Sequence, residues 1–277
     1  MSEPLVAGVD GLDSAMLAAW ERDGYLHVPG FLSGSDLAKL VSLVDEIGRT
    51  PDGDRELLQH YELVDDEVRI CRSEHLIDGH QLLRELLTEG SMVAMASQLL
   101  GEPAVLYKEK INYKLAGGAG FSPHQDAPAY PFIDTHTTCM LAIDDATAIN
   151  GCLDVVSGMH GELLPMDDAG CIRSDVADQM QWLPTPIAAG DLLWFHSRAP
   201  HRSGPNRSEH DRRGLFCTYN AASHGDLRHR YYEEKLEQFA HGTEGDTTRV
   251  SLIGDFQGRR PSASQIADHE RRLREQA

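Results

Sequence analysis

The feature that most constrains the fold of this chain is a change in sequence pattern near residue 104. Before it, apolar residues recur at helical spacing; after it, short runs of strand-forming residues alternate with Gly, Pro, Asn and Asp. Such closely spaced short strands indicate a sandwich or double-sheet jelly roll, because a parallel α/β sheet needs a helix between successive strands. The strands that this pattern predicts are Ala104–Lys114, Thr137–Ile143, Leu153–Val156, Leu192–Phe195 and Leu215–Tyr219.

The first hundred residues are predicted to be mostly helical. Asp13 caps a helix that ends at Gly24, a residue suited to the left-handed conformation that closes helices. A short extended piece, Tyr25–Pro29, follows. From Ser35 onward, apolar residues at positions 37, 40, 41, 44 and 47 mark one face of a second helix. Two further helices are predicted at Gln81–Leu87 and Ser91–Leu100.

The chain shows no division into separate domains. No internal repeat, low-complexity block or linker interrupts its 277 residues. We therefore expect one domain over residues 1–277, with a helical N-terminal part (1–103), a β core (104–225) and a helical C-terminal tail (226–277), which contains a helix at Arg228–Ala240. The predicted fold class is mainly β with flanking N-terminal α-helices.

Charge and hydropathy narrow the range of partners. The chain carries 25 Lys and Arg against 44 Asp and Glu, a formal charge of −19, and such a field repels nucleic acid and anionic lipid. The same charge is ordinary for an acidic cytosolic protein. No apolar run approaches the ~18 residues of a membrane-spanning helix. The sequence thus predicts a small-molecule partner, with no nucleic acid and no membrane.

The cysteines and the N-terminus predict a cytoplasmic location. The five cysteines are widely spaced, odd in number and never arranged as C-x-x-C, which argues against a disulfide scaffold or a zinc ribbon. They are Cys71, Cys139, Cys152, Cys171 and Cys217. The N-terminal residues lack the basic and apolar regions of a signal peptide.

The strongest chemical signal is the segment His124-Gln125-Asp126. On extended backbone, side chains two residues apart point to the same face, so His124 and Asp126 can converge on one ion. A distal histidine then completes a set of two histidines and one carboxylate, which suits non-haem Fe(II) and leaves coordination positions open. We expect His201 in that role, because it follows a predicted strand. The chain has 14 histidines, so other histidines remain alternatives. They are His160, His196, His210, His224 and His241.

An arginine eleven residues after His201 supports this interpretation. Arg212 stands just ahead of the predicted strand Leu215–Tyr219 and can bind a dicarboxylate with two parallel hydrogen bonds, which a lysine cannot do. Arg213 is the competing candidate. Being one residue further, it should face the opposite side of the strand.

Together these segments resemble the phytanoyl-CoA dioxygenase family, whose members are Fe(II)- and 2-oxoglutarate-dependent oxygenases on a double-stranded β-helix, a cupin-like jelly roll. The resemblance covers roughly residues 15–225 and rests on His124-Gln125-Asp126, His201-x-Ser203-Gly204-x-Asn206 and Arg212. Weaker similarities are found in other segments of the chain. These are Asp23-Gly24-Tyr25 with Pro29-Gly30-Phe31, Lys108–Lys114, Asn150-Gly151-Cys152-Leu153, and Ser157-Gly158-Met159-His160, in which Met159 departs from the family pattern.

The resemblance implies roles for individual residues. His124, Asp126 and His201 would bind Fe(II), and Arg212 with Ser203 would hold the distal carboxylate of 2-oxoglutarate. O2 would be the third reactant. Three further residues have less defined expected roles: Lys108 or Asn112 would contact the metal-proximal end of 2-oxoglutarate, and Gln125 would point toward substrate or cosubstrate. A solvated strand cation is an equal alternative for Lys108.

The implied activity is hydroxylation of an unactivated C–H bond, with release of succinate and CO2. Polar and cationic residues around the predicted site fit a small anionic or zwitterionic substrate, an amino acid or an aminoalkylphosphonate such as 2-aminoethylphosphonate. These residues are Arg72, Lys108, Lys110, Asn112, Tyr130 and Arg202. The alternatives are a larger natural-product or acyl substrate, or a non-catalytic, cupin-like metal-binding protein, which would have no use for a dicarboxylate site. The sequence leaves the oligomeric state open.

Overall fold

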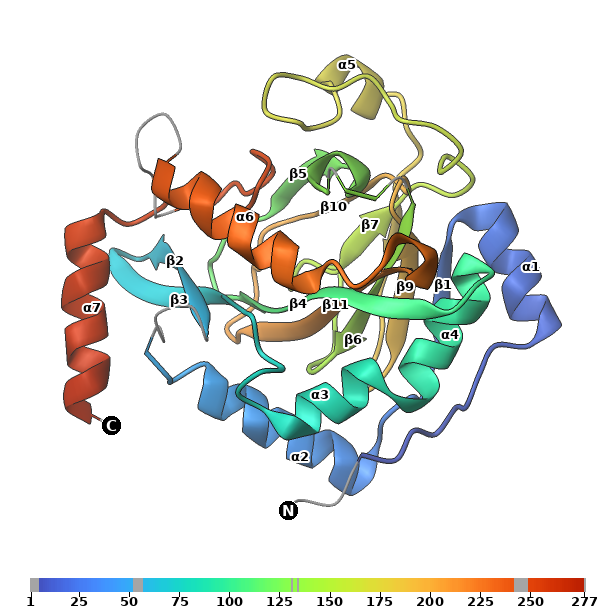
Figure 1. The fold of residues 1–277 in the computed structure, drawn as a ribbon. Helices are drawn as coiled ribbons and strands as arrows, with labels where there is room; N and C mark the ends of the chain where they lie inside the picture. Colours follow the sequence, from blue (N-terminus) through green and yellow to red (C-terminus); the bar gives the residue numbers. More distant parts are fainter. Residues whose placement is uncertain (1–4, 52–56, 131, 134, 242–248, 277) are drawn as a thin grey trace.

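Two antiparallel sheets form the centre of the molecule, and helices cover the outer side of the larger one (Figure 1). The computed structural model describes residues 5–51, 57–130, 132–133, 135–241 and 249–276. Both sheets contribute side chains to one cavity, so their inner faces oppose each other. This arrangement agrees with the predicted mainly β fold class with flanking helices.

The larger sheet has seven strands in the order β1-β9-β6-β11-β4-β3-β2. Its long central pair, β11 and β4, runs in register from Arg212 opposite Lys114 to Ala221 opposite Ala104, with one irregularity near Thr218. The strands are β1 (Tyr25–Val28), β2 (Leu58–Val64), β3 (Glu67–Glu74), β4 (Ala104–Lys114), β6 (His136–Ala142), β9 (Leu192–His196) and β11 (Arg212–Ala221).

The smaller sheet has four strands in the order β5-β10-β7-β8. Its strands are short: β5 (Phe121–His124), β7 (Leu153–Val155), β8 (Leu183–Thr185) and β10 (His201–Ser203). At the free edge of β5, Phe121 forms an isolated antiparallel bridge with Phe256 from the C-terminal part of the chain. That contact places a C-terminal segment along the edge of the smaller sheet.

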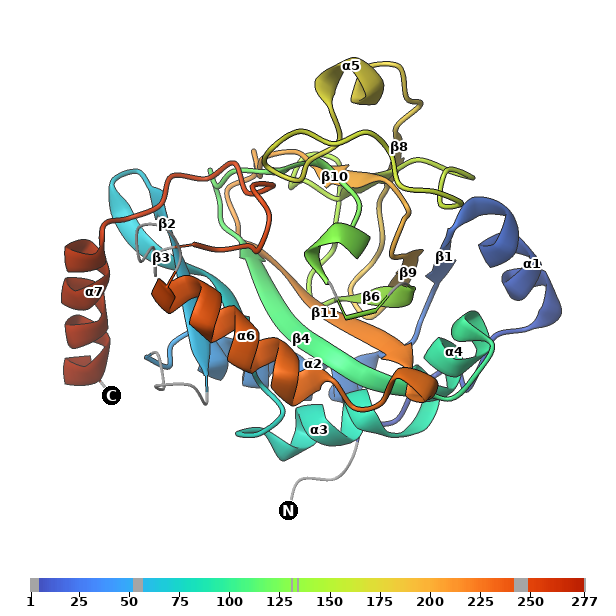
Figure 2. The same ribbon diagram turned by 45° about the horizontal axis from the view of Figure 1, so that its top comes forward.

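The helices lie mainly around the larger sheet. In Figures 1 and 2, α2, α3 and α4 lie on its outer side, α6 runs across β4, and α7 stands beside β3. The helices are α1 (Ser14–Asp23), α2 (Gly34–Ile47), α3 (Gln81–Thr88), α4 (Gly90–Leu100), α5 (Ser174–Ala177), α6 (Arg228–His241) and α7 (Ala263–Gln276), with short 3-10 turns η1 (Ala127–Ala129) and η2 (Ala222–His224).

Alternate residues of the central strands face two different cores. On β6, Leu141 packs with the helices, whereas Met140 belongs to a second core between the sheets. On β11, Leu215 and Phe216 divide in the same way. The period of two along a strand produces this separation. On β4 it turns Ile111 toward the helices and leaves the neighbouring even-numbered positions for the space between the sheets.

The first helix shows why the predicted boundaries are correct. The Asp13 carboxylate accepts a hydrogen bond from the Met16 amide at 2.8 Å, which satisfies a free donor of the first turn. Gly24 ends the helix with φ of 75°, and a Cβ at that position would lie 2.3 Å from Nδ1 of His160. Both the left-handed conformation and the close approach therefore require glycine.

The prediction of a mostly helical first hundred residues was wrong for residues 58–74. There β2 and β3 form a hairpin that extends the larger sheet beyond β4. Asp65 and Asp66 connect the strands with φ of 50° and 63°, the left-handed conformation typical of a two-residue hairpin turn. Aspartates adopt it less readily than Asn-Gly, so this turn carries a weak sequence signal.

Candidate active site

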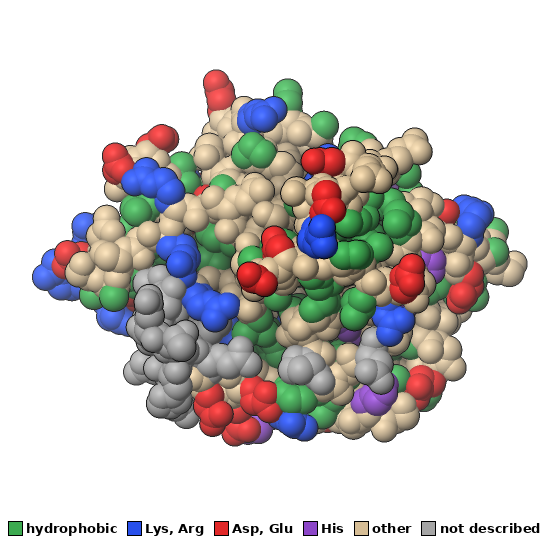
Figure 3. Space-filling view, turned by 90° about the horizontal axis from the view of Figure 1, so that it is seen from above, with side chains coloured by type: hydrophobic (Ala, Val, Ile, Leu, Met, Phe, Trp, Pro, Cys, Tyr) green, Lys and Arg blue, Asp and Glu red, His purple; other side chains and the backbone are tan. Residues whose placement is uncertain are grey.

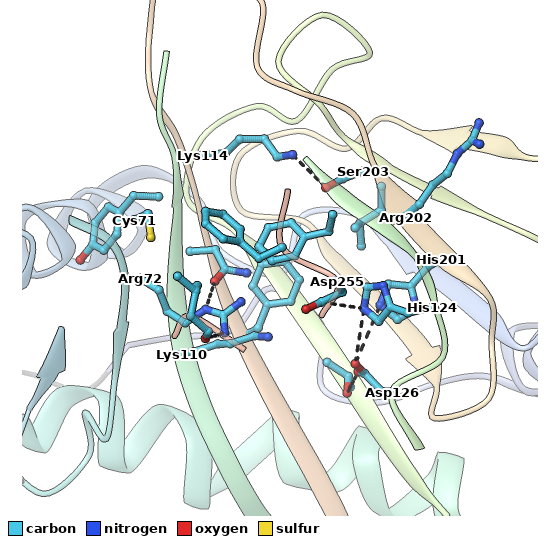
Figure 4. Close-up of a pocket in the computed structure, with 18 of the residues that line it drawn as sticks. Cys71, Arg72, Lys110, Lys114, His124, Asp126, His201, Arg202, Ser203 and Asp255 are labelled. Carbon is cyan, nitrogen blue, oxygen red and sulfur yellow. Dashed lines mark hydrogen bonds and ion pairs between the residues drawn. The ribbon is translucent and has the colours of Figure 1, made fainter. Parts of the chain in front are cut away.

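One cavity opens between the two sheets, and residues far apart in the sequence line it (Figure 4). Its walls come from β4 and β11 of the larger sheet, from β5 and β10 of the smaller sheet, and from the segment 250–256 that follows α6. An adjoining lobe reaches toward α6 and includes Tyr130 and Tyr231.

His124, Asp126 and His201 converge at one side of this cavity. β5 and β10 pair so that His201 lies directly opposite His124, with ring centroids 4.2 Å apart. Asp126 Oδ1 lies 3.9 Å from Nε2 of His124 and 4.0 Å from Nε2 of His201. Each of the three offers a ligand atom within 4.8 Å of the others, and no second group of this kind occurs among the described residues.

Backbone carbonyls orient both imidazole rings. Nδ1 of His124 lies 2.7 Å from the Ser122 carbonyl, and Nδ1 of His201 lies 3.0 Å from the Ala199 carbonyl. A carbonyl can only accept, so each Nδ1 carries the proton and each Nε2 keeps its lone pair. This is the arrangement by which ligating histidines are usually held toward a metal.

The charge states of His201 and Asp126 also suit a divalent cation. Burial lowers the pKa of His201 to about 4, so its ring is neutral near pH 7. Burial alone would raise the pKa of Asp126, but His201 and Lys108 outweigh it and hold the pKa well below its ordinary value. Two imidazoles and one carboxylate form the donor set that suits Fe(II) with open coordination positions.

Asp126 reaches the site by a route that the strand argument did not predict. β5 ends at His124, and Asp126 has helical φ and ψ of −71° and −28° at the start of η1. The turn, and not the period of two, brings the carboxylate back beside the histidines. The Thr138 hydroxyl donates to Oδ2 of Asp126 at 3.1 Å, which leaves Oδ1 directed at them.

The alternative distal histidine His196 lies outside the site. It ends β9, and its Nδ1 accepts a hydrogen bond from the Arg198 amide at 3.1 Å. Its ring packs against those of His160 and Trp20. The geometry therefore favours His201 over His196.

Arg212 and Lys114 define a second part of the cavity. Arg212 is 3% exposed and donates from Nη2 to the Gly151 carbonyl at 2.6 Å, and its Nε has no hydrogen-bond partner among the described residues. Lys114, its neighbour across the strands, donates to the Ser203 hydroxyl at 2.8 Å (Figure 4). Gly151 has φ of 72°, and a Cβ there would lie 2.9 Å from the Lys114 side chain.

Arg213 faces the other side of β11. Its guanidinium forms ion pairs with Asp144, at 2.7 Å, and with Asp45. Both partners lie outside the cavity lining. The alternation along the strand thus separates the two arginines, as the sequence predicted.

A row of cations continues along β4 toward the three converging side chains. Lys108 and Lys110 line the cavity, and neither forms a hydrogen bond or ion pair with another described side chain. Lys108 Nζ lies 4.2 Å from the ring centroid of Tyr130, and Lys110 Nζ lies 5.6 Å from that of Phe216. Burial lowers the pKa of both lysines. The polar residues grouped by sequence all line the cavity or its lobe: Arg72, Lys108, Lys110, Asn112, Tyr130 and Arg202.

Comparison with known proteins identifies this arrangement. The family model of phytanoyl-CoA dioxygenase (PhyH) matches residues 20–214. The chain belongs to this family. It is 44% identical over 251 residues to a methylphosphonate hydroxylase of Gimesia maris, covering 90% of this chain and 96% of that protein. It is 36% identical over 225 residues to a 2-aminoethylphosphonate dioxygenase of an uncultured bacterium, covering 79% and 86%.

Solved structures support the fold. The crystal structure of EctD from S. alaskensis with 2-oxoglutarate and 5-hydroxyectoine has a TM-score of 0.66 at 18% identity, covering 92% of this chain and 86% of that chain. The carbocyclase SnoK from nogalamycin biosynthesis has a TM-score of 0.64 at 22% identity, covering 80% and 88%. The predicted family, jelly-roll fold class and enzyme class, an Fe(II)- and 2-oxoglutarate-dependent dioxygenase, are therefore confirmed. Among the described residues, no helix is both long and apolar enough to cross a membrane.

Gln125 and Asn112 make contacts that the sequence did not predict. Gln125 does not line the cavity: its amide donates to the carbonyls of Glu162 and Arg198 and accepts from the Leu164 amide, so it fixes a loop instead of facing substrate or cosubstrate. Asn112 lines the cavity, but its Oδ1 accepts from Nε of Arg72 at 2.8 Å and thereby holds that arginine in place.

Lys114 and Asp255 are charged residues of the cavity for which the sequence predicted no role. Lys114 stands at an even-numbered position of β4, a correctly predicted strand. The alternation of Lys108, Lys110, Asn112 and Lys114 along this strand indicates that all four side chains face the same side, and it could have predicted Lys114 as a cavity residue. Asp255 lies 3.5 Å from Nε2 of His124 through its Oδ2. No pattern in the sequence connects Asp255 with His124, because their contact depends on where the C-terminal segment packs.

Proposed function

We propose that this protein hydroxylates a small phosphonate, using Fe(II) held by His124, Asp126 and His201 together with 2-oxoglutarate and O2. The observation that carries the proposal is the concentration of cations inside one cavity of a chain whose net charge is −19. On the surface seen from above, acidic and basic side chains are both scattered (Figure 3). Inside the cavity, Arg202 pairs with Asp154, and the other cations lie in two groups, each of which fits one anion.

The first group fits 2-oxoglutarate. Arg212 and Lys114 meet beside Ser203, and neither forms an ion pair with a described carboxylate. A carboxylate bound there would gain charge-assisted hydrogen bonds, the stronger kind in proteins. We assign this group, with the Ser203 hydroxyl, to the distal carboxylate of 2-oxoglutarate.

The second group fits a phosphonate. Arg72, Lys108 and Lys110 line both the cavity and its lobe, which also include Asp126. The nearest lysines of the two groups, Lys110 and Lys114, are four residues apart on β4, about 13 Å along an extended strand, and Arg72 on β3 lies opposite Asn112 between them. Two of the relatives are named for phosphonate substrates. A doubly charged phosphonate matches three cations better than a large acyl group does.

In the proposed reaction, 2-oxoglutarate loses CO2 and becomes succinate, and one oxygen atom of O2 enters a C–H bond of the substrate. Iron bound by the three side chains supplies this oxidative chemistry. The protein positions the reactants: Arg212 and Lys114 hold one anion, and Arg72, Lys108 and Lys110 hold the other. The fixed cations lie in a largely buried, low-dielectric cavity, where they act more strongly than in water.

The test is succinate release with Fe(II), 2-oxoglutarate and a panel of phosphonates, amino acids and acyl thioesters, with the product followed by phosphorus NMR. We expect turnover with a phosphonate that depends on both iron and O2. Lys110→Met should raise the KM for the phosphonate and leave the 2-oxoglutarate requirement unchanged. Lys39→Met, which removes a partly exposed lysine paired with Asp36 on α2, is the matched control. Turnover confined to amino acids or thioesters would refute the phosphonate assignment.

We also propose that residues 1–277 act as one cytoplasmic domain. Both ends of the chain join the central sheets: β1 pairs with β9, and Phe256 pairs with Phe121. All five cysteines are free and buried, which suits a reducing compartment.

A further inference from the structure

The C-terminal segment brings a carboxylate into the cavity. The Ser122 amide donates to the Asp255 carbonyl at 2.7 Å, and the Gln257 amide donates to the Gly120 carbonyl at 3.1 Å. These bonds, with the bridge between Phe121 and Phe256, attach the segment to the free edge of β5. The attachment directs the Asp255 side chain toward His124 (Figure 4).

Asp255 does not serve the functions that its position first suggests. The ring of His124 is oriented through Nδ1 by the Ser122 carbonyl, whereas Asp255 lies on the Nε2 side. Asp255 also stands outside the group whose ligand atoms lie within 4.8 Å of one another, which contains His124, Asp126 and His201 alone. It is therefore neither the residue that orients this histidine nor a member of the compact ligand set.

The Asp255 carboxylate has an unused hydrogen-bonding capacity. Its side chain is 7% exposed, and Oδ1 is buried without a hydrogen-bond partner among the described residues. Across the same cavity, the Arg72 side chain is 4% exposed, and its Nη2 is likewise buried without a partner. A buried unpaired polar atom is costly, so such a pair points to a ligand that satisfies both.

A ligand with both charges would satisfy the two groups at once. A phosphonate accepts hydrogen bonds from Arg72, Lys108 and Lys110, but it repels Asp255. An ammonium group on the same small molecule donates to Asp255. Both Arg72 and Asp255 line the cavity and its lobe together with Asp126, so the two ends of a short zwitterion would lie on either side of a carbon near the metal ligands.

We propose that Asp255 binds the ammonium group of the substrate and makes the enzyme prefer an aminoalkylphosphonate to an alkylphosphonate of the same size. This inference rests on the proposed phosphonate hydroxylase function. An alkylphosphonate leaves the carboxylate buried and unpaired, and sites built to bond a polar group discriminate strongly against analogues that lack it.

The test compares 2-aminoethylphosphonate with propylphosphonate, in which a methyl group replaces the ammonium group. Binding to the Zn(II)-loaded protein in the presence of 2-oxoglutarate is measured by calorimetry, so that no turnover occurs. The wild-type protein should bind the aminophosphonate at least about tenfold more tightly. In Asp255→Asn the preference should disappear through weaker binding of the aminophosphonate alone, with Zn(II) affinity unchanged. Asp144→Asn, whose carboxylate pairs with Arg213 outside the cavity, should keep the preference.

Several results would overturn the inference. Equal binding of the two ligands by the wild-type protein would do so without any variant, even if Asp255→Asn failed to fold. An unchanged preference in Asp255→Asn, or loss of both ligands together with Zn(II), would also refute it, the latter by showing that Asp255 supports the metal. Each of these results is compatible with turnover of a phosphonate, so the proposed function can hold while this inference fails. If the wild-type protein neither binds nor turns over any phosphonate, the proposed function fails and this inference fails with it.

Discussion

Arg212 on β11 lies directly opposite Lys114 on β4, and the charged ends of both side chains are buried in the same cavity. Lys114 bonds to the Ser203 hydroxyl and to the Gly204 carbonyl, and Arg212 bonds to the Gly151 carbonyl. Two like charges side by side, neither in an ion pair with a described carboxylate, are unfavourable in a buried site. An anionic ligand removes that cost, and the following two predictions test this relationship.

Replacing Arg212 by alanine should raise the 2-oxoglutarate concentration needed for half-maximal succinate release by well over tenfold. Removing one partner of a buried, charge-assisted contact costs about 2–5 kcal/mol. Iron affinity should change little, because Arg212 is not among the converging metal-ligand candidates.

Arg213→Ala is the matched control for this experiment. It removes a half-buried arginine whose ion pairs with Asp144 and Asp45 lie on the opposite side of the strand. Such partly exposed pairs contribute about 0–1 kcal/mol of stability, and the 2-oxoglutarate requirement should not change. A normal requirement in Arg212→Ala, with a large rise in Arg213→Ala, would assign the role to Arg213.

Binding of 2-oxoglutarate should take up a proton on Lys114. Burial and the charge of Arg212 lower the pKa of Lys114 to about 7 in the ligand-free protein, so at pH 8 most molecules carry it neutral. A bound carboxylate favours the charged ammonium and raises this pKa. Calorimetry in buffers of different ionisation enthalpy should therefore detect uptake of nearly one proton at pH 8 and little at pH 6. Lys114→Met should abolish the uptake; the same uptake in that variant would place the proton elsewhere.

The predictable parts of this structure are those controlled by local sequence. Asp13 and Gly24 bound the first helix through their own hydrogen bonding and φ, and β4 has the predicted limits, Ala104–Lys114. The hairpin at 58–74 lacked a strong turn signal. β8 and β10 have three residues each, too few for a period to be recognised in the sequence.

In the candidate site, too, the residues that follow a local sequence pattern were predictable, and those placed by packing were not. His124, Asp126, His201 and Arg212 follow a family spacing, and the structure brings all four to one cavity. The prediction that Gln125 points toward substrate or cosubstrate was wrong, because β5 ends before this residue and its side chain bonds to a loop. Asp255 could not be predicted, since its position depends on the packing of a segment more than a hundred residues away from β5.

His201→Ala should reduce Fe(II) affinity far more than His196→Ala. Loss of a direct ligand should exceed the 10–100-fold, roughly, that is lost with an outer-sphere partner. His196, which packs against His160 and Trp20, is the natural control. Equilibrium dialysis against a competing chelator measures both variants without requiring turnover. Loss of metal in His196→Ala, with normal binding in His201→Ala, would show that the distal ligand is wrongly assigned.

The stability of the metal-free protein should fall as pH decreases from about 6.5 to 4.5. Burial lowers the pKa of four histidines well below the ordinary value of 6.5: to about 3 for His60 and His136, and to about 4 for His196 and His201. Below pH 6.5 the unfolded chain therefore binds protons at these rings while the native protein does not. Each ring contributes stability that is fully present above 6.5 and is lost as pH falls, at up to about 1.4 kcal/mol per pH unit.

Urea unfolding at pH 7.5, 6.0 and 5.0 measures this loss, which should reach about 5 kcal/mol per pH unit at its steepest for the four rings together. His136→Phe isolates one of them. This ring is 0% exposed, and neither of its nitrogens has a hydrogen-bond partner among the described residues, so phenylalanine can replace it without breaking a described bond. The variant should lose about one quarter of the histidine-dependent slope while remaining folded at pH 7.5. A wild-type unfolding midpoint that stays constant between pH 7.5 and 5.0, or an unchanged slope in His136→Phe, would show that these histidines already take up protons in the folded protein.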